Sequence, residues 1–332
     1  MKQSILKRVL PVAMVFLLLF AAGCGNSPVK DAAEDTAQEP VVIGTEPQAE
    51  STAADHSSLY TVDSTTETSD NESYASDTAD VNAILVERMG ILTMTSADIN
   101  KSGDATGDYT AGSNAAVAVI SKGQLTLNQS NITTNGLGAV GLAVSGEGTQ
   151  LAATDTSVYA SGASSPAILV RDDASAVITG GTFSTEGADS PAILLLGGRL
   201  TLSGAALSSK SGDAVRIDVG ANFLTLDNTI VSGMSIFAEE ASLELRLSNG
   251  ASFSGALGGS LPARASVFLD ASSKLVLTGE TYLSVLVNAD LTHANIESNG
   301  FNLYYDSEAP DNAYLGSQSF MLPGGGFLAP II

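Results

Sequence analysis

The chain has 332 residues and a formal net charge of −22, from 36 acidic residues against 14 Lys and Arg. This balance excludes nucleic-acid binding through phosphate contacts, which needs clustered Lys and Arg. The single Cys excludes an intramolecular disulfide framework, and no Cys/His cluster has the spacing of a zinc site.

The first 24 residues are organised like a bacterial targeting segment. Lys2, Lys7 and Arg8 precede an apolar run over residues 9–22, which is short for a membrane span. The run ends in Ala-Ala-Gly and Cys24, and this sequence resembles the lipobox of bacterial lipoproteins. The resemblance implies a lipid on Cys24, hence a membrane partner and an extracytoplasmic location at the bacterial cell membrane or cell surface. The alternative is an ordinary secretory signal with a chance Cys.

Residues 25–80 have the composition of a linker. They hold 13 Asp and Glu, and Lys30 is the one basic residue amid Ser, Thr and Ala. Low hydrophobicity combined with charge of one sign cannot bury enough surface to offset the entropy of ordering. We therefore expect a disordered tether. An acidic calcium-binding tract is the alternative, although the spaced Asp and Gly pattern of a calcium loop is missing.

From residue 81 onward the chain repeats itself. Ala116, Gly141, Ala167, Ala192 and Ala214 occupy matching places in short apolar segments, 25, 26, 25 and 22 residues apart. Each copy continues into a second run that alternates with period two, which places aliphatic side chains inside and hydroxyls outside. A period in the low to mid twenties with Gly-rich turns predicts a β-solenoid of roughly eight coils.

Each repeat ends on a glycine after a short polar stretch. The closing glycines are Gly103, Gly136, Gly162, Gly187 and Gly212. We expect them to adopt positive φ, which a residue with a Cβ atom tolerates poorly.

An insertion at residues 104–113 lengthens one repeat to 33 residues between closing glycines. Insertions in solenoids emerge as loops on one face of the stack, and such loops often bind ligands. Tyr109, which follows Asp104 and Asp108 in the insertion, is therefore a candidate ligand-binding residue. A solvated turn is the alternative.

The C-terminal residues, from about 301, are rich in aromatic side chains. They include Tyr304, Tyr305, Tyr314, Phe320 and Phe327. Because the open end of a parallel stack must be covered to prevent edge-to-edge growth, we predict a cap there. The predicted domains are thus a signal peptide at 1–24, a linker at 25–80 and a solenoid with its cap at 81–332.

Three segments resemble bacterial surface proteins that are built as right-handed parallel β-helices. They are residues 162–170 (Gly-Ala-Ser-Ser-Pro-Ala-Ile-Leu-Val), 187–194 (Gly-Ala-Asp-Ser-Pro-Ala-Ile-Leu) and 324–330 (Gly-Gly-Gly-Phe-Leu-Ala-Pro). The resemblance implies the pectin-lyase-like fold, an all-β right-handed parallel β-helix, here with about 22–26 residues per coil. It also implies an adhesin-like or carbohydrate-binding role, although lyases and hydrolases share this fold.

Polysaccharide-cleaving relatives are implied to use clustered acids, with calcium and an arginine base in lyases or three Asp in hydrolases. The clustered candidate is Arg171 with Asp172 and Asp173, whose carboxylates could bind Ca2+ or a ligand, or act as acid and base. A solvated turn that Arg171 neutralises is the alternative, so no catalytic or metal-ligating residue is assigned. His56 and His293 are the only histidines, which argues against a Ser-His-Asp triad.

These observations favour a non-catalytic cell-surface lipoprotein that binds a polysaccharide or a host or matrix surface at the end of its tether. A polysaccharide lyase or hydrolase is one alternative, and it would need Asp172, Asp173 and a basic residue to converge in one groove. A structural envelope protein without a dedicated ligand is the other.

Overall fold

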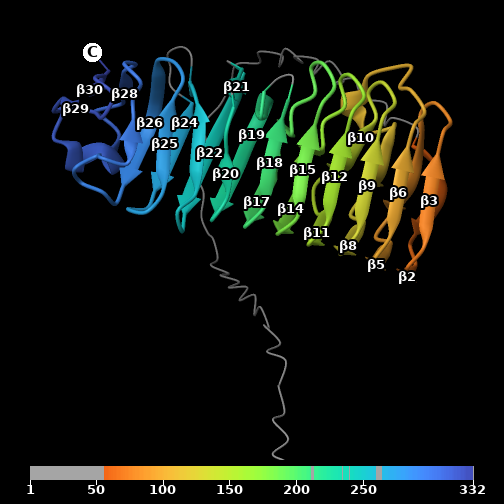
Figure 1. Cartoon of the computed structure of the whole chain (residues 1–332). Coiled ribbons are helices and arrows are strands. Elements are labelled where there is room, and N and C mark those ends of the chain that lie inside the picture. The colour runs from red at the N-terminus through yellow and green to blue at the C-terminus, as the bar shows by residue number, and fades with distance from the viewer. Residues whose placement is uncertain (1–55, 211–212, 234, 239, 259–263, 332) are drawn as a thin grey trace, which may run out of the picture. The chain divides into compact units, whose positions relative to one another are not determined.

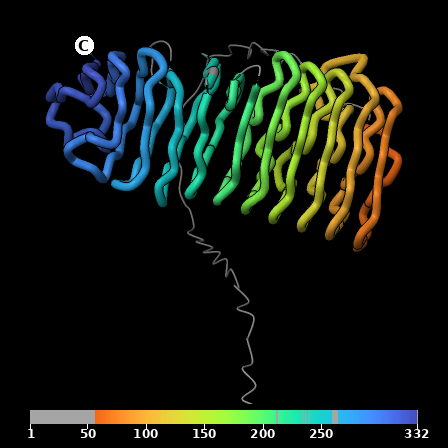
Figure 2. The backbone as a smooth tube through the Cα atoms, in the orientation of Figure 1, coloured from red at the N-terminus to blue at the C-terminus, as the bar shows by residue number. Residues whose placement is uncertain are grey.

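The computed structural model describes residues 56–331, apart from 211–212, 234, 239 and 259–263. These residues form a parallel β-solenoid of about 11 turns with about 24 residues per coil (Figures 1 and 2). The all-β parallel architecture and the coil length predicted from the repeat are confirmed, whereas the prediction of roughly eight coils was too low. The predicted signal peptide, Cys24 and the predicted linker up to residue 55 lie outside the described residues.

Each coil contributes strands to as many as three sheets, which we name A, B and C in their order along a coil. Sheet A contains β1 (Ser57–Asp63), β4 (Val81–Glu87), β7 (Ala115–Val119), β10 (Val140–Ser145), β13 (Ile168–Arg171), β16 (Ile193–Leu196), the first part of β19 (Val215–Asp227) and β21 (Ser235–Phe237). Sheet B contains β2 (Thr66–Asp70), β5 (Ile91–Thr95), β8 (Gln124–Asn128), β11 (Gln150–Thr154), β14 (Ser175–Thr179), β17 (Arg199–Ser203), the rest of β19, β22 (Ala241–Ser248), β24 (Ala265–Leu269), β26 (Thr281–Asn288), β28 (Leu303–Tyr305), β29 (Phe320–Met321) and β30 (Phe327–Pro330).

Sheet C contains β3 (Ser73–Ser76), β6 (Asp98–Lys101), β9 (Asn131–Thr134), β12 (Ser157–Ala160), β15 (Thr182–Thr185), β18 (Ala206–Ser209), β20 (Ile230–Val231), β23 (Ser252–Gly255), β25 (Lys274–Leu277) and β27 (Ile296–Glu297). Two short 3-10 helices complete the fold, η1 (Tyr109–Ala111) and η2 (Pro310–Leu315).

Neighbouring coils stack in register, so that like residues lie above one another. Leu151 in β11, for example, pairs with Leu125 in the coil before and with Ala176 in the coil after. The inward aliphatic side chains merge into one continuous core along the stack. Each buried Leu, Ile or Val contributes roughly 1.5–3 kcal/mol, so stability accumulates coil by coil.

The closing glycines serve close stacking rather than positive φ, which corrects the sequence-based expectation. Gly103, Gly136, Gly162 and Gly187 are absent from the residues with positive φ. A Cβ atom on Gly162 would lie 1.9 Å from the carbonyl oxygen of Gly136, and one on Gly187 would lie 1.7 Å from that of Gly162. Gly136, Gly162 and Gly187 therefore each rest on the carbonyl of the closing glycine before them, and Gly103 rests on that of Thr78. Gly212 lies outside the described residues.

The last part of the predicted linker, residues 56–80, is an ordered first coil, and the expectation of disorder was wrong there. Its strands β1, β2 and β3 pair in parallel with β4, β5 and β6. Polar groups occupy its inward positions. Tyr60 donates a hydrogen bond to Glu67, Ser69 and Tyr74 share one of 2.9 Å, and the rings of Tyr60 and Tyr74 are 5.0 Å apart. Terminal repeats of solenoids are atypical in this way because their inner surface must end against solvent.

At the other end, the aromatic C-terminal residues close the stack. The hairpin of β29 and β30 lies beside β28, with β30 parallel to β28 and antiparallel to β29. Tyr305 is fully buried, and its hydroxyl donates a 2.8 Å hydrogen bond to the carbonyl of Gln318.

Candidate functional site

The insertion at residues 104–113 lies against the outer face of sheet A. This face carries a ladder of apolar side chains, one per coil, that are buried although they point away from the core. The ladder consists of Leu85, Ala118, Ala143, Leu169 and Leu194. Tyr109 in η1 packs against the cluster that contains this ladder, so the insertion covers an outward apolar surface of the solenoid.

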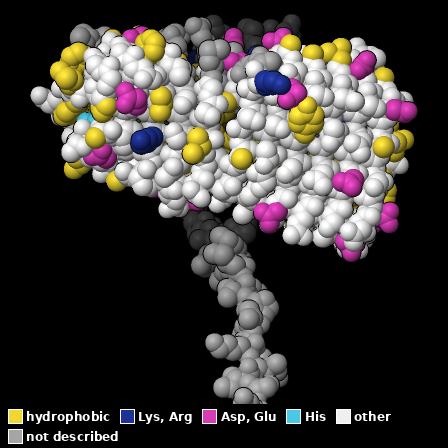
Figure 3. Space-filling view, viewed as in Figure 1, with side chains coloured by type: hydrophobic (Ala, Val, Ile, Leu, Met, Phe, Trp, Pro, Cys, Tyr) yellow, Lys and Arg dark blue, Asp and Glu magenta, His cyan; other side chains and the backbone are white. Residues whose placement is uncertain are grey.

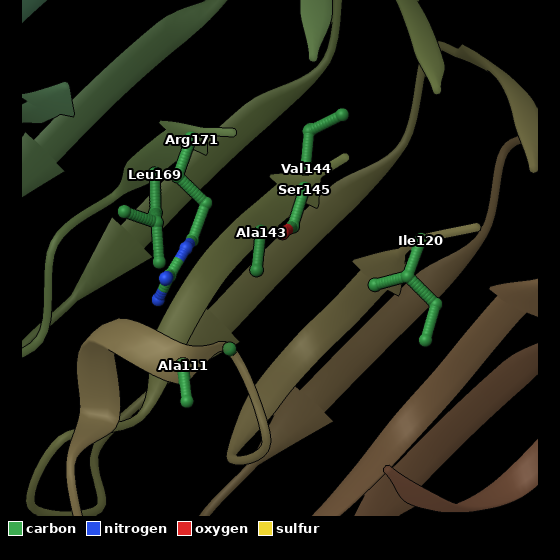
Figure 4. Close-up of a pocket in the computed structure, with 8 residues that line it drawn as sticks. Ala111, Ile120, Ala143, Val144, Ser145, Leu169 and Arg171 are labelled. Carbon is green, nitrogen blue, oxygen red and sulfur yellow. The ribbon is translucent and has the colours of Figure 1, made fainter. Parts of the chain in front are cut away.

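Arg171 fastens the insertion to the sheet. Its Nη1 donates a 2.5 Å hydrogen bond to the carbonyl oxygen of Thr110, and its Nε donates one of 2.7 Å to Asp172. In Figure 4 the Arg171 side chain extends from its strand toward the ribbon that carries Ala111. Ser145, one coil earlier, also donates to the Asp172 carboxylate at 2.9 Å. The candidate Arg171 and Asp172 pair therefore holds structure in place.

Tyr109 is half-buried beside charged groups from later coils. Burial raises the pKa of Tyr109, and the carboxylates of Asp218, Asp108 and Asp189 act in the same direction, while Arg216 opposes them. Because the phenol keeps its proton at neutral pH, Tyr109 can donate a hydrogen bond but is a poor base.

Arg216 and Asp218 of β19, with Asp213 two residues before the strand, form a small charged cluster near Tyr109. Arg216 makes a 3.3 Å ion pair with the buried Asp213. Burial raises the pKa of Asp218 and Asp213 adds to this, whereas Arg216 opposes it. Arg216 thus compensates part of the charge of these two carboxylates.

Asp172 and Asp173 are turn residues at the corner between sheets A and B. Their φ values are 52° and 62°. At the equivalent corner that follows β7, Ser121 and Lys122 have φ values of 51° and 65°. Asp is one of the residues that adopt this left-handed conformation most readily. The position therefore explains the paired carboxylates through backbone geometry, which is the solvated-turn alternative of the sequence analysis.

No metal-binding cluster assembles in the described part of the chain. Within those residues, no group of three or more His, Cys, Asp or Glu is placed to hold a metal ion. His293 is buried, its Nδ1 lies 3.4 Å from the Asn288 side-chain nitrogen, and its ring meets Phe320 edge-on. The depression beside the insertion, lined in part by Ile120 and Arg171 (Figure 4), does not admit a water molecule and is a packing crease.

The outer face of sheet B carries side-chain stacks that the sequence analysis missed. The guanidinium of Arg199 lies 3.7 Å from the ring centroid of Phe223 in the next coil, and that of Arg246 lies 4.1 Å from the ring of Phe268. Toward the C-terminus, Tyr282 and Tyr304 are stacked with centroids 4.9 Å apart and an interplanar angle of 18°. The 4.9 Å between the tyrosine rings matches the spacing of parallel strands. All three stacks join residues that are paired in register on adjacent strands.

The repeat does contain a signal for the first stack. Arg199 and Phe223 each precede the same three residues, Leu-Thr-Leu, and the strands pair so that these residues coincide. Aligning the copies on this second apolar run would have placed the Arg above the Phe. Because the rings stack along the solenoid axis, their edges rather than their faces meet solvent.

Sheet C presents a more polar surface with one charged stack. Tyr159 donates a 2.8 Å hydrogen bond to Glu186, which also pairs with Lys210 at 3.2 Å. The hydrogen bond to Glu186 raises the pKa of Tyr159. On the face seen in Figure 3, acidic side chains are scattered and basic ones are few. In the described residues, no helix has the length and hydrophobicity needed to cross a membrane.

Comparison of the chain with protein-family models, with curated proteins and with solved structures finds no significant match.

Proposed function

We propose that this chain is a non-catalytic, adhesin-like cell-surface lipoprotein whose solenoid binds a glycan or a host or matrix surface. The observation that carries the proposal is the outer face of sheet B. It presents hydroxyl-bearing side chains coil after coil, followed by the Arg199–Phe223 and Arg246–Phe268 stacks.

The outer face of sheet B repeats once per coil, and we call the strand that each coil contributes a rung. A surface of such repeated rungs suits an extended partner. Each rung offers a modest contact, and contacts along one polymer add because every later one forms at high effective concentration. Guanidinium groups that lie on aromatic rings are held in place before a ligand arrives, which lowers the entropy lost on binding.

The arrangement of the acids supports a binding role over catalysis. Asp172 is already paired with Arg171 and accepts from Ser145, and Asp173 occupies the same turn. A lyase or hydrolase of this fold would need free carboxylates and a base in one groove.

The proposal is tested by retention of the full-length chain, purified in detergent, on a panel of immobilised polysaccharides and matrix proteins, with Ca2+ and with chelator. Retention on one class without release of sugar supports a binding module. Release of sugar would overturn the non-catalytic assignment. If the chain binds no member of the panel, a structural envelope protein is favoured.

The anchor is the second part of the proposal. The lipobox-like residues that end in Cys24 support lipidation there and an extracytoplasmic membrane location, and residues 25–55 would then lie between the anchor and the first coil. Their acidic composition favours an extended spacer.

A further inference from the structure

The outer face of sheet B divides into two parts of different chemistry. From β19 to β24 the outward side chains include Asp227, Glu244 and Arg246. On β5, β8, β11, β14 and β17, by contrast, the outward residues are uncharged apart from Arg199. We name the outward side of these five strands the neutral face.

Threonine is the commonest outward residue of the neutral face. The outward threonines are Thr93, Thr95, Thr126, Thr154, Thr179 and Thr201. Thr93 pairs directly with Thr126, and Thr154 with Thr179, so their hydroxyls recur at the spacing of parallel strands, about 4.8 Å. Because threonine is β-branched, few side-chain rotamers are open to it, and the hydroxyl positions are nearly fixed.

The lack of charge on this face is unusual for such an acidic chain and selects the class of ligand. Like charge would repel a polyanion from the chain as a whole, and the neutral face offers it only Arg199. A polycation finds no carboxylate on these strands. An uncharged polymer has no charge of its own to desolvate, and its hydroxyls match the threonine hydroxyls as donors and acceptors, so the hydrogen bonds that both surfaces lose to water can be replaced.

Arg199 marks the boundary of the neutral face and is free of acidic partners. Among the described residues it makes no ion pair with a carboxylate, while its guanidinium lies on the Phe223 ring. Stacking occupies the flat side of the guanidinium and leaves its N–H groups to donate at the rim. Such donors suit the ring and hydroxyl oxygens of a neutral sugar.

From these observations we infer that the neutral face binds an uncharged, extended polysaccharide that lies along the solenoid axis and contacts one rung after another. This inference rests on the proposed binding function and names its ligand class. The strand spacing is comparable to the length of one sugar residue, so consecutive sugars would meet consecutive strands. Most of these strands offer an outward hydroxyl, and Ala152 and Val177 add apolar contacts between Thr126 and Thr201.

The test measures binding of the full-length chain and of Thr126 variants to three immobilised polymers. Two are insoluble and neutral, a glucan and chitin, and the third is a polyuronate. Thr126→Glu and Thr126→Lys place opposite charges on the neutral face, in the middle of β8. Thr133→Glu and Thr133→Lys are the matched controls, because Thr133 lies on the same coil and faces outward from sheet C. Circular dichroism and melting temperature verify that all four variants fold.

We expect both Thr126 variants to weaken binding to the neutral polymer by about tenfold or more, since a charge of either sign is desolvated there, and both Thr133 variants to bind like the parent chain. Binding to the polyuronate alone, strengthened by Thr126→Lys, would overturn the ligand class while keeping the binding function. Equal effects of the Thr126 and Thr133 changes would overturn the assignment to the neutral face. Binding to none of these polymers or panel members would refute the proposed function itself.

Discussion

Arg171 in β13 donates a 2.5 Å hydrogen bond to the carbonyl oxygen of Thr110 in η1, across 61 residues of sequence. In a solenoid most contacts join adjacent coils, so this bond is an exception. It connects the insertion between the second and third coils with a strand of the fifth.

Replacing Arg171 with Ala should loosen the insertion without unfolding the stack. The change removes a charge-assisted hydrogen bond at a partly exposed site, and we expect a loss of about 1 kcal/mol in unfolding free energy. Hydrogen exchange of residues 104–113 should accelerate. Lys122→Ala is the control and should leave this exchange unchanged; equal protection in both variants would contradict the fastening role.

Replacing Gly162 with Ala should destabilise the solenoid by about 1–3 kcal/mol or more, because overpacking forces the backbone apart. The added Cβ would lie 1.9 Å from the Gly136 carbonyl oxygen. Gly107→Ala is the matched control, since a Cβ at Gly107 meets nothing within 4 Å and should change stability little. Denaturant unfolding of the two variants measures the difference, and equal midpoints would refute the stacking explanation.

Stability should fall as the pH drops below about 6.5, because burial lowers the pKa of His293 in the folded chain. The nearby Asp290 opposes this shift but does not reverse it. The unfolded chain takes up a proton at a pH at which the folded chain does not. The stabilisation is therefore complete above pH 6.5 and is lost toward the lower folded pKa.

Below about pH 6.5 the unfolding free energy should fall with pH, by at most about 1.4 kcal/mol per pH unit, which is the value for one proton. His293→Gln should flatten the slope, and His56→Gln should keep it. The pKa of Asp270 is lowered to about 2 by hydrogen bonds from Ser273, Asn249 and Ser272 despite the opposing effect of burial, so Asp270 titrates below this pH range, whereas the raised pKa of Asp218 moves that carboxylate toward it. An unchanged slope in His293→Gln would assign the pH dependence to other groups.

Replacing Cys24 with Ser should release the chain from the membrane, because the thiol is the expected site of the lipid. Metabolic labelling with a fatty acid and fractionation of cells would follow the change. A Ser27→Ala variant is the control and should stay labelled and membrane-bound. Membrane association that survives Cys24→Ser would sink the anchor proposal.

The sequence predicted the stacking of the coils well because apolar residues recur at equivalent positions of each repeat. Ala167 and Ala192, for instance, occupy equivalent places that are both fully buried. The first coil escaped this reading because Glu67, Ser69 and Tyr74 stand where other coils have Leu92, Met94 and Ile99. A polar inner surface combined with exposed acids has the composition of a linker, although the backbone pairing is that of a coil.

The site predictions were limited for a different reason. Tyr109 and Asp172 were selected as residues of a loop and a turn, but what each does depends on residues of other coils. Tyr109 lies near the charged groups of β19, and Asp172 accepts a hydrogen bond from Ser145, one coil earlier. The contact from Arg171 to the insertion follows from no local pattern. The stack of Arg199 on Phe223 could have been found, since it follows from register alone.

The polar first coil has a mechanical consequence. A pull applied through the residues before Ser57 reaches β1 first and loads its parallel pairing with β4 from one end, so the bonds break singly rather than together. The first coil, with a polar inner surface, resists such peeling least. Unravelling should then slow at the third to fifth coils, where the insertion and Arg171 fasten several coils together. Under tension the first coils would thus unfold and lengthen the chain slightly, while the later coils and their outer faces stay folded.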